Sequence, residues 1–116
     1  MLNRRALGEQ QEHLAKEWLT AHGYQILEQN FRCRQGEIDL IGRDGRYLVF
    51  IEVKYRKDSR CGDPLEAVDR RKQERILLTA RFYLRSRGYS ELTPCRFDIV
   101  AVRGENITVL KNAFGI

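Results

Sequence analysis

The sequence predicts a single α/β domain whose elements follow the order α-β-β-β-α-β-β. Two stretches with apolar residues at helical spacing and five short stretches rich in apolar residues support this prediction. Turn residues separate the stretches, with no repeat, low-complexity tract or linker between them. A chain of 116 residues is long enough to bury one core but too short for two. We therefore expect one domain over residues 1–116.

The first half of the chain predicts one helix followed by three strands. Apolar residues at helical spacing predict a helix over Ala6–His22, and Gly23 is a favoured residue directly after a helix end. Between the second and third strands, Asp44-Gly45 is a strong hairpin signal. The three strands are expected over Tyr24–Arg34, Glu37–Gly42 and Arg46–Arg56.

The second half predicts a long helix and a final pair of strands. In the sequence Asp-Pro-Leu-Glu, we expect Asp63 as N-cap and Pro64 as the first helical residue, with Glu66 reaching back to the cap. This helix is expected to continue to Ser86. The last two strands are expected over Arg96–Val102 and Ile107–Leu110.

Composition excludes several classes of protein. No segment approaches the roughly 18 apolar residues of a membrane helix, and the N-terminus lacks the apolar region of a signal peptide. The three cysteines are widely spaced and give neither a disulfide framework nor a zinc motif, so we expect reduced thiols in the cytoplasm and no membrane partner. The net charge of +5 favours polyanionic partners only slightly.

The third strand carries charges where the sheet is expected to be most covered. Both of its faces are apolar until Glu52, which is typical of a central strand in a sheet covered on both sides. Ionised groups are costly there unless they pair or bind a metal ion. A hairpin turning at Asp44-Gly45 would place Asp39 opposite Val49 to Phe50, near Glu52.

Asp39, Glu52 and Lys54 have the chemistry of a phosphodiester-hydrolysing site. Two neighbouring carboxylates repel each other, and a divalent cation such as Mg²⁺ or Mn²⁺ relieves that conflict. The cation polarises a phosphate and acidifies the attacking water, which Lys54 can orient because it shares a face with Glu52. The alternative is an ion pair at a strand end. For Glu-x-Lys taken alone this alternative is favoured, because short motifs recur by chance.

Residues on the two helices and in the loop before the second helix extend this site. Glu12 lies at the edge of the first apolar stripe, so it can lean towards the sheet. Lys72 falls within the inward stripe of the second helix, where it either snorkels to solvent or reaches the carboxylates or a phosphate. Further basic groups flank the acidic centre, as a nuclease needs in order to bind a nucleic-acid strand. Taken singly, each of these groups is typical of a solvated surface. They are Arg56, Lys57, Arg60, Arg70, Arg71 and Arg75.

The sequence also resembles a known family over nearly its whole length. The blocks NFRCRQGEIDLI and FIEVKYR are specific, and GDPLEAVDRRKQERILLTARFYL and RFDIVAV extend the similarity. They resemble the YraN-like family of small bacterial proteins, whose function is uncharacterised and which is placed in the restriction-endonuclease-like superfamily. The resemblance implies a restriction-endonuclease-like α-β-β-β-α-β core. Its mixed central sheet would be flanked by helices and followed by a C-terminal β-hairpin.

The superfamily motif, PD-(D/E)xK, implies roles for four residues. Asp39 and Glu52 resemble its metal ligands, and Lys54 resembles its catalytic lysine. Glu12 matches a glutamate that many members carry on the first helix, including archaeal Holliday-junction resolvases. The usual Pro-Asp is Ile38-Asp39 here, which changes no ligand.

The first hypothesis is therefore a metal-dependent nuclease acting on DNA, including branched or structured DNA. Glu12, Asp39 and Glu52 would coordinate Mg²⁺ or Mn²⁺ directly or through water, with the Val53 carbonyl as a further ligand. Two alternatives stay open: a nucleic-acid-binding module without turnover, and an accessory protein whose charges are structural pairs. A homodimer is compatible with such a nuclease, but no feature of the sequence specifies one. The residues expected to hold phosphates are Arg56, Arg71, Lys72 and Arg75.

Overall fold

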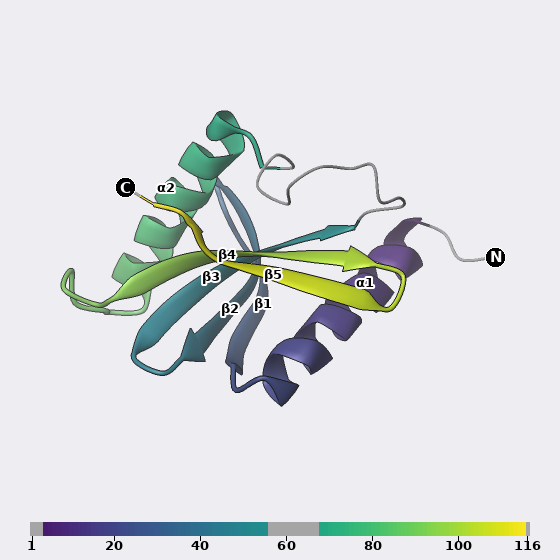
Figure 1. Ribbon diagram of the computed structural model, residues 1–116. Coiled ribbons are helices and arrows are strands. Elements are labelled where there is room, and N and C mark those ends of the chain that lie inside the picture. Colours follow the sequence, from purple (N-terminus) through teal and green to yellow (C-terminus); the bar gives the residue numbers. More distant parts are fainter. Residues whose placement is uncertain (1–3, 56–67, 116) are drawn as a thin grey trace.

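The computed structural model describes residues 4–55 and 68–115, which form two helices and one five-stranded sheet. The sheet order is β1-β2-β3-β4-β5; β3 and β4 are parallel, and the other neighbours are antiparallel (Figure 1). This confirms the mixed α/β fold and the C-terminal hairpin of β4 and β5. The elements are α1 (Arg4–Ala21), β1 (Gln25–Cys33), β2 (Gly36–Asp44), β3 (Tyr47–Tyr55), α2 (Arg70–Ser86), β4 (Cys95–Arg103) and β5 (Asn106–Phe114).

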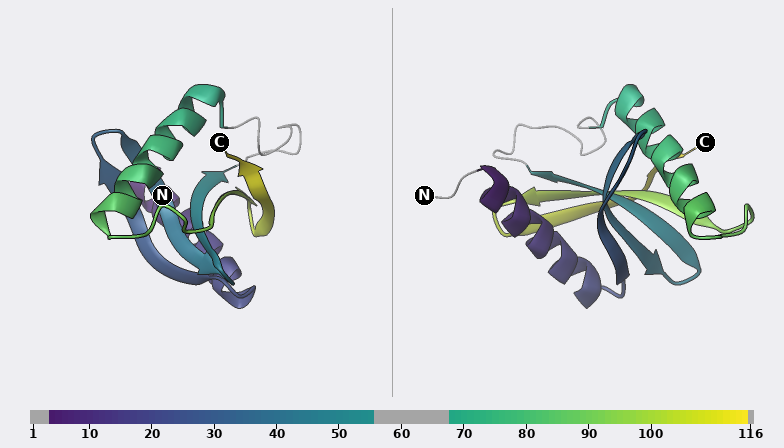
Figure 2. Two further views of the ribbon diagram at one scale, coloured as in Figure 1. Left: turned by 90° about the vertical axis from the view of Figure 1, so that its left-hand side faces the viewer. Right: turned by 180° about the vertical axis from the view of Figure 1, so that it is seen from behind.

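The two helices cover opposite faces of the sheet, as Figures 1 and 2 show. Leu48 and Phe50 of β3 belong to the core cluster on the α2 side, whereas Val49 and Ile51 belong to the cluster on the α1 side. Because successive side chains of a strand point to opposite faces, β3 must be apolar on both. The predicted central strand is confirmed. No helix in the described ranges is long and apolar enough to cross a membrane.

The start of α2 differs from the prediction. Asp69 is the N-cap, and its Oδ1 accepts the N–H of Lys72 at 2.8 Å. Val68 is buried but lies outside the helix, so a helix running unbroken from Asp63 is wrong. The Asp63, Pro64 and Glu66 cap itself lies outside the described residues. Aspartate is a favoured N-cap because its carboxylate accepts the backbone N–H of the residue three positions later, which has no partner within the helix. The sequence has an aspartate suited to this role at Asp69 as well as at Asp63.

The register of the β2–β3 hairpin also differs from the prediction. Asp44 pairs with Tyr47, so the turn is formed by Gly45 and Arg46 rather than by Asp44 and Gly45. Gly45 has a φ of +61°, which glycine adopts without strain. Asp44 stays in the strand, where its carboxylate accepts from Arg96 at 2.7 Å. The predicted pairing was therefore wrong by two residues, and the shift brings Asp39 closer to Glu52 than expected.

The sheet divides near one end of β2 and β3. Pairing between these strands stops at Leu40 and Ile51. Beyond that point β2 still pairs with β1, and β3 still pairs with β4, so two arms diverge (Figures 1 and 2). The β1–β2 arm packs closely against α2, since a Cβ on Gly36 would lie 3.1 Å from Thr79 Oγ1. We call the point of separation the fork; it places Asp39 and Glu52 at the start of the two arms.

Candidate active site

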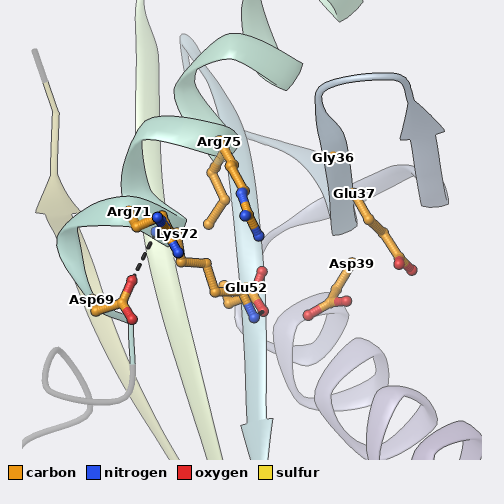
Figure 3. A pocket seen from close by; sticks show the side chains of 9 residues that line it. Gly36, Glu37, Asp39, Glu52, Asp69, Arg71, Lys72 and Arg75 are labelled. Carbon is orange, nitrogen blue, oxygen red and sulfur yellow. Dashed lines mark hydrogen bonds and ion pairs between the residues drawn. The ribbon is translucent and has the colours of Figure 1, made fainter.

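An open pocket of about 390 Å³ lies at the fork, between the diverging strands and the first turns of α2 (Figure 3). Glu52 contributes a carboxylate from β3, and Asp39 contributes one from β2. Lys72 extends from α2 towards Glu52, whereas the side chain of Glu37 turns away. The pocket therefore combines two carboxylates with a cationic wall. It is lined by Gly36, Glu37, Asp39, Glu52, Asp69, Arg71, Lys72, Arg75 and Ile76.

A backbone hydrogen bond fixes Asp39 at the fork. Its Oδ2 accepts the N–H of Val53 at 2.8 Å, one step beyond the last strand pair of Leu40 and Ile51. The carboxylate thus takes the place of a carbonyl acceptor where the ladder ends. This bond orients Asp39 beside Glu52, as the sequence predicted through a different register.

The surroundings of Asp39 disfavour its charge. Burial and the negative charge of Glu52 raise the pKa of Asp39 to about 7, although the Val53 N–H acts in the opposite direction. Glu12 and Glu37 raise this pKa further. Asp39 therefore titrates close to neutral pH. Shifts of this kind, with a nearby like charge, are concentrated at functional sites.

Glu52 is held by two lysines. It is only 6% exposed, and its Oε1 lies 2.8 Å from Lys72 Nζ and 3.5 Å from Lys54 Nζ. Burial and the neighbouring Lys72 lower the pKa of Lys54 more than Glu52 raises it. For Lys72, burial acts to lower the pKa, but contacts with Glu52 and Lys54 and the charge of Asp39 together outweigh it, and the pKa rises. The sequence left two roles open for Lys72, snorkelling to solvent or reaching the carboxylates or a phosphate. In the structure its ammonium reaches the carboxylate of Glu52.

The donor set suits a hydrated hard cation. Across residues 4–55 and 68–115, no three or more His, Cys, Asp or Glu side chains gather closely enough to hold a metal ion. Mg²⁺ is nevertheless commonly bound by one or two carboxylates while it keeps several waters. Asp39 and Glu52 supply two carboxylates at an open pocket, so the residues present fit Mg²⁺ or Mn²⁺. They do not form a closed, fully protein-ligated site.

The other predicted ligand or binding positions have different outcomes. Glu12 is half-buried, and its charge raises the pKa of Asp39, yet it completes no three-carboxylate cluster among the described residues. The Val53 carbonyl as a ligand stays a prediction, since the structure assigns only its N–H a partner at this site. Arg56 lies outside the described residues. On α2, Arg71 and Arg75 are exposed and line the pocket.

Sequence reasoning missed two charged residues of the pocket. Asp69 lines the pocket because it caps α2, and the wrong helix start hid this role. Glu37 also lines it, but it is exposed and contacts Arg32 at 3.4 Å. The spacing of Glu37 two residues before Asp39 was the available signal.

A second buried charge cluster, which the sequence did not reveal, surrounds Asp98 on β4. Asp98 is fully buried, and its Oδ1 accepts from Arg96 Nε and from the N–H of Asn112, both at 2.9 Å. Its Oδ2 accepts from Tyr24 Oη and Arg96 Nη2, both at 2.8 Å. Arg96 also donates to Asp44 and lowers the pKa of that carboxyl. We call this set the Asp98 network; it consists of Tyr24, Asp44, Arg96, Asp98 and Asn112.

Comparison with known proteins identifies the family. The model of the uncharacterised protein family UPF0102 matches residues 11–102. A UPF0102 protein of Lachnoclostridium phytofermentans is 48% identical over 113 residues, covering 97% of this chain and 96% of its own. One from Klebsiella pneumoniae is 49% identical and covers 93% and 85%; one from Symbiobacterium thermophilum is 53% identical and covers 84% and 82%. The chain therefore belongs to the UPF0102 family, the YraN-like family that its motifs indicated.

Proposed function

We propose that this protein is a Mg²⁺- or Mn²⁺-dependent nuclease that hydrolyses phosphodiester bonds in DNA, with a restriction-endonuclease-like core. The observation that carries the proposal is the pair of carboxylates, Asp39 and Glu52, at the fork. Burial and Glu52 raise the pKa of Asp39 to about 7, and the pair opens into a pocket with cationic side chains. Such a pair is completed by a divalent cation.

The residues divide the chemistry between them. Asp39 and Glu52 would hold the ion, which when bound polarises the phosphate and acidifies water. Lys54 lies 3.5 Å from Glu52 and would position the attacking water by donating to it. Arg71 and Arg75 line the same pocket and would hold the phosphates flanking the scissile bond. Glu12 would act on the ion through water, since it completes no direct cluster in the described part of the chain.

Cleavage of a panel of linear, flapped and four-way DNA substrates in Mn²⁺ or Mg²⁺ tests this proposal. The parent should cut at least one substrate, and Asp39→Asn and Glu52→Gln should each lose about a hundredfold or more, as removal of one electrostatic catalytic group does. Glu74→Gln is the matched control, because Glu74 is an exposed carboxylate of α2 that does not line the pocket. Equal cutting by the parent and both site variants would exclude Asp39 and Glu52 as the catalytic centre.

One observation favours a second candidate, a nucleic-acid-binding module without turnover. Lys72 and Lys54 already pair with Glu52, as they would in a purely structural cluster. Such a module would bind DNA or RNA in a salt-dependent way, without cutting it and without loss of affinity in Asp39→Asn. If it neither bound nor cut any nucleic acid in the panel, an accessory protein recognised by another protein would be the better description.

A further inference from the structure

We infer that Lys72 is a positioning residue that couples the binding of a divalent cation to the binding of a substrate phosphate. It holds Glu52 when no cation is bound, and it moves to a substrate phosphate when a cation is bound. This inference rests on the proposed function. It assigns Lys72 a role distinct from that of Lys54, although both contact the same oxygen of Glu52.

The backbone of Lys72 is fixed while its ammonium lies at the pocket surface. Its N–H donates to the N-cap carboxylate of Asp69 at 2.8 Å, which anchors the residue in the first turn of α2. Its side chain is 39% exposed and extends into the pocket (Figure 3). A lysine ammonium is a point charge on a flexible four-carbon stem. It can therefore change partner without disturbing the helix.

Glu52 needs a counter-charge whether or not a cation is bound. Its side chain is only 7% exposed, and a buried carboxylate without a partner is strongly destabilising. Lys72 Nζ, 2.8 Å from Oε1, supplies that partner. A divalent cation bound to Glu52 and Asp39 would meet this ammonium beside the same oxygen, and the two cations repel each other. The cation and Lys72 therefore compete for Glu52.

Two features allow Lys72 rather than Lys54 to leave. Lys54 stands two residues from Glu52 on the same strand, and its side chain is less exposed than that of Lys72, 26% against 39%. Lys72 shares α2 with Arg71 and Arg75, which line the same pocket. A phosphate among these groups would attract Lys72 while the cation repels it from Glu52. The cation and the phosphate thus both favour movement of Lys72 away from Glu52, so each should strengthen the binding of the other.

Calorimetric titration with Mn²⁺ in the absence of DNA tests the first half of the inference. Lys72→Met removes the competitor, so the variant should bind Mn²⁺ about fivefold more tightly than the parent or better, the lower end of ordinary coupling between sites. Lys72→Arg keeps the charge and should restore the parent affinity. Arg71→Met removes an equal charge from the same helix, at a residue that does not contact Glu52. We expect its Mn²⁺ affinity to stay within about twofold of the parent.

Binding of a fluorescent DNA duplex, followed by anisotropy with and without Ca²⁺ and with a gel to verify intact DNA, tests the second half. The parent should bind more tightly when Ca²⁺ is present, by about fivefold or more, and so should Arg81→Met, because Arg81 is exposed on the same helix and does not line this pocket. Lys72→Met should keep only the part of this gain that comes from the ion itself at the phosphate, so its Ca²⁺ effect should be smaller than that of the parent. Lys72→Gln replaces Lys72→Met in both assays if the latter does not fold by circular dichroism.

The outcomes separate this inference from the proposed function. If the parent binds no Mn²⁺ and cuts no DNA, the proposed function fails and the inference fails with it. If the parent binds Mn²⁺ and cuts DNA, but Lys72→Met has parental Mn²⁺ affinity and the full Ca²⁺ effect of the parent, only the inference is overturned. An equal gain in Arg71→Met would also overturn it, because the effect would then be general electrostatics of the pocket.

Discussion

Two aspartates of this protein occupy the same kind of position and have opposite surroundings. Asp39 accepts the N–H of Val53 where β2 and β3 separate. Asp98 accepts the N–H of Asn112 where the β4–β5 ladder is interrupted. Each carboxylate replaces a backbone acceptor that the sheet lacks at that point. The neighbouring charge differs: Asp98 meets Arg96, whereas Asp39 meets Glu52.

The difference separates a charge that the protein itself neutralises from one that it leaves uncompensated. In the Asp98 network, Arg96 and Tyr24 complete the hydrogen bonding of the carboxylate, so no ligand is needed. At the fork, Glu52 makes the ionised form of Asp39 unfavourable, and the pocket is open to solvent. Burial of a charge is therefore not itself the signal. A carboxylate whose ionised form is disfavoured by its neighbours, and which lies at an open pocket, is the better candidate for a ligand-binding position.

Breaking the Asp98 network should have the largest effect on stability. Arg96→Met leaves Asp98 buried beside fewer partners, and we expect a loss of about 3–5 kcal/mol in the free energy of unfolding, the usual result of removing one member of a buried pair. Urea denaturation measures it. Lys111→Met is the matched control, since exposed Lys111 contacts Asp44 at 3.4 Å and should cost less than about 1 kcal/mol. Similar losses in both variants would show that the Asp98 network stabilises the fold no more than an exposed ion pair does.

Replacing Asp39 should raise the free energy of unfolding, by less than the replacement of Arg96 lowers it. Because the fold raises the pKa of Asp39 from 3.8 to about 7, its stabilising contribution is complete below pH 3.8 and is lost as pH rises through about 7. Asp39→Asn cannot ionise and keeps an oxygen for the Val53 N–H. It should exceed the parent in stability by about 2 kcal/mol at pH 8, after a discount for the open pocket, and by much less at pH 5.

Urea denaturation of the parent and Asp39→Asn at these two pH values, without divalent ions, measures the difference. Glu74→Gln is the control, because this exposed carboxylate lies away from the pocket and should show no such pH dependence. A variant that is less stable than the parent at pH 8 would mean that Asp39 is structural, as Asp98 is.

The smallest effect on stability is expected at the mouth of the pocket. Arg71→Ala and Arg75→Ala remove exposed side chains and should change the free energy of unfolding by less than about 0.5 kcal/mol. If they contact phosphates, each should lower the slope of DNA affinity against salt concentration by about 0.9 on logarithmic axes. Arg81→Ala is the control on the same helix, because Arg81 does not line this pocket. Equal slopes for all three variants would place the DNA elsewhere.

The sequence was sufficient for elements whose signals are local. Alternation along β3 identified a strand apolar on both faces. At its end, Glu52 and Lys54 contact each other at 3.5 Å, as their shared face predicted. The hairpin register was not local. Asp44 is held in the strand by Arg96, a residue 52 positions further along the chain, and no pattern near the turn records this contact.

The remaining errors have the same origin. The sequence offered two caps for α2, and only the structure shows that Asp69 bonds to Lys72 N–H. The direction of the Lys72 side chain depends on Glu52 across the interior, so helical spacing left two roles open. Tyr24 and Asp98 are 74 positions apart, and their hydrogen bond follows only from the assembled sheet. Local chemistry brought Asp39, Glu52 and Lys72 into consideration, while the contacts between them required the fold.

The fork also changes where the sheet exposes its backbone. A sheet ordinarily has two outer edges, and their unpaired N–H and C=O groups must be covered or charged. Where β2 and β3 separate beyond Leu40 and Ile51, this sheet gains two interior edges that face each other across the pocket. Asp39 covers one of them by accepting the N–H of Val53. The walls of the pocket are thus two strands and the first turns of a helix, and the main-chain groups of those strands border the space that a ligand would fill.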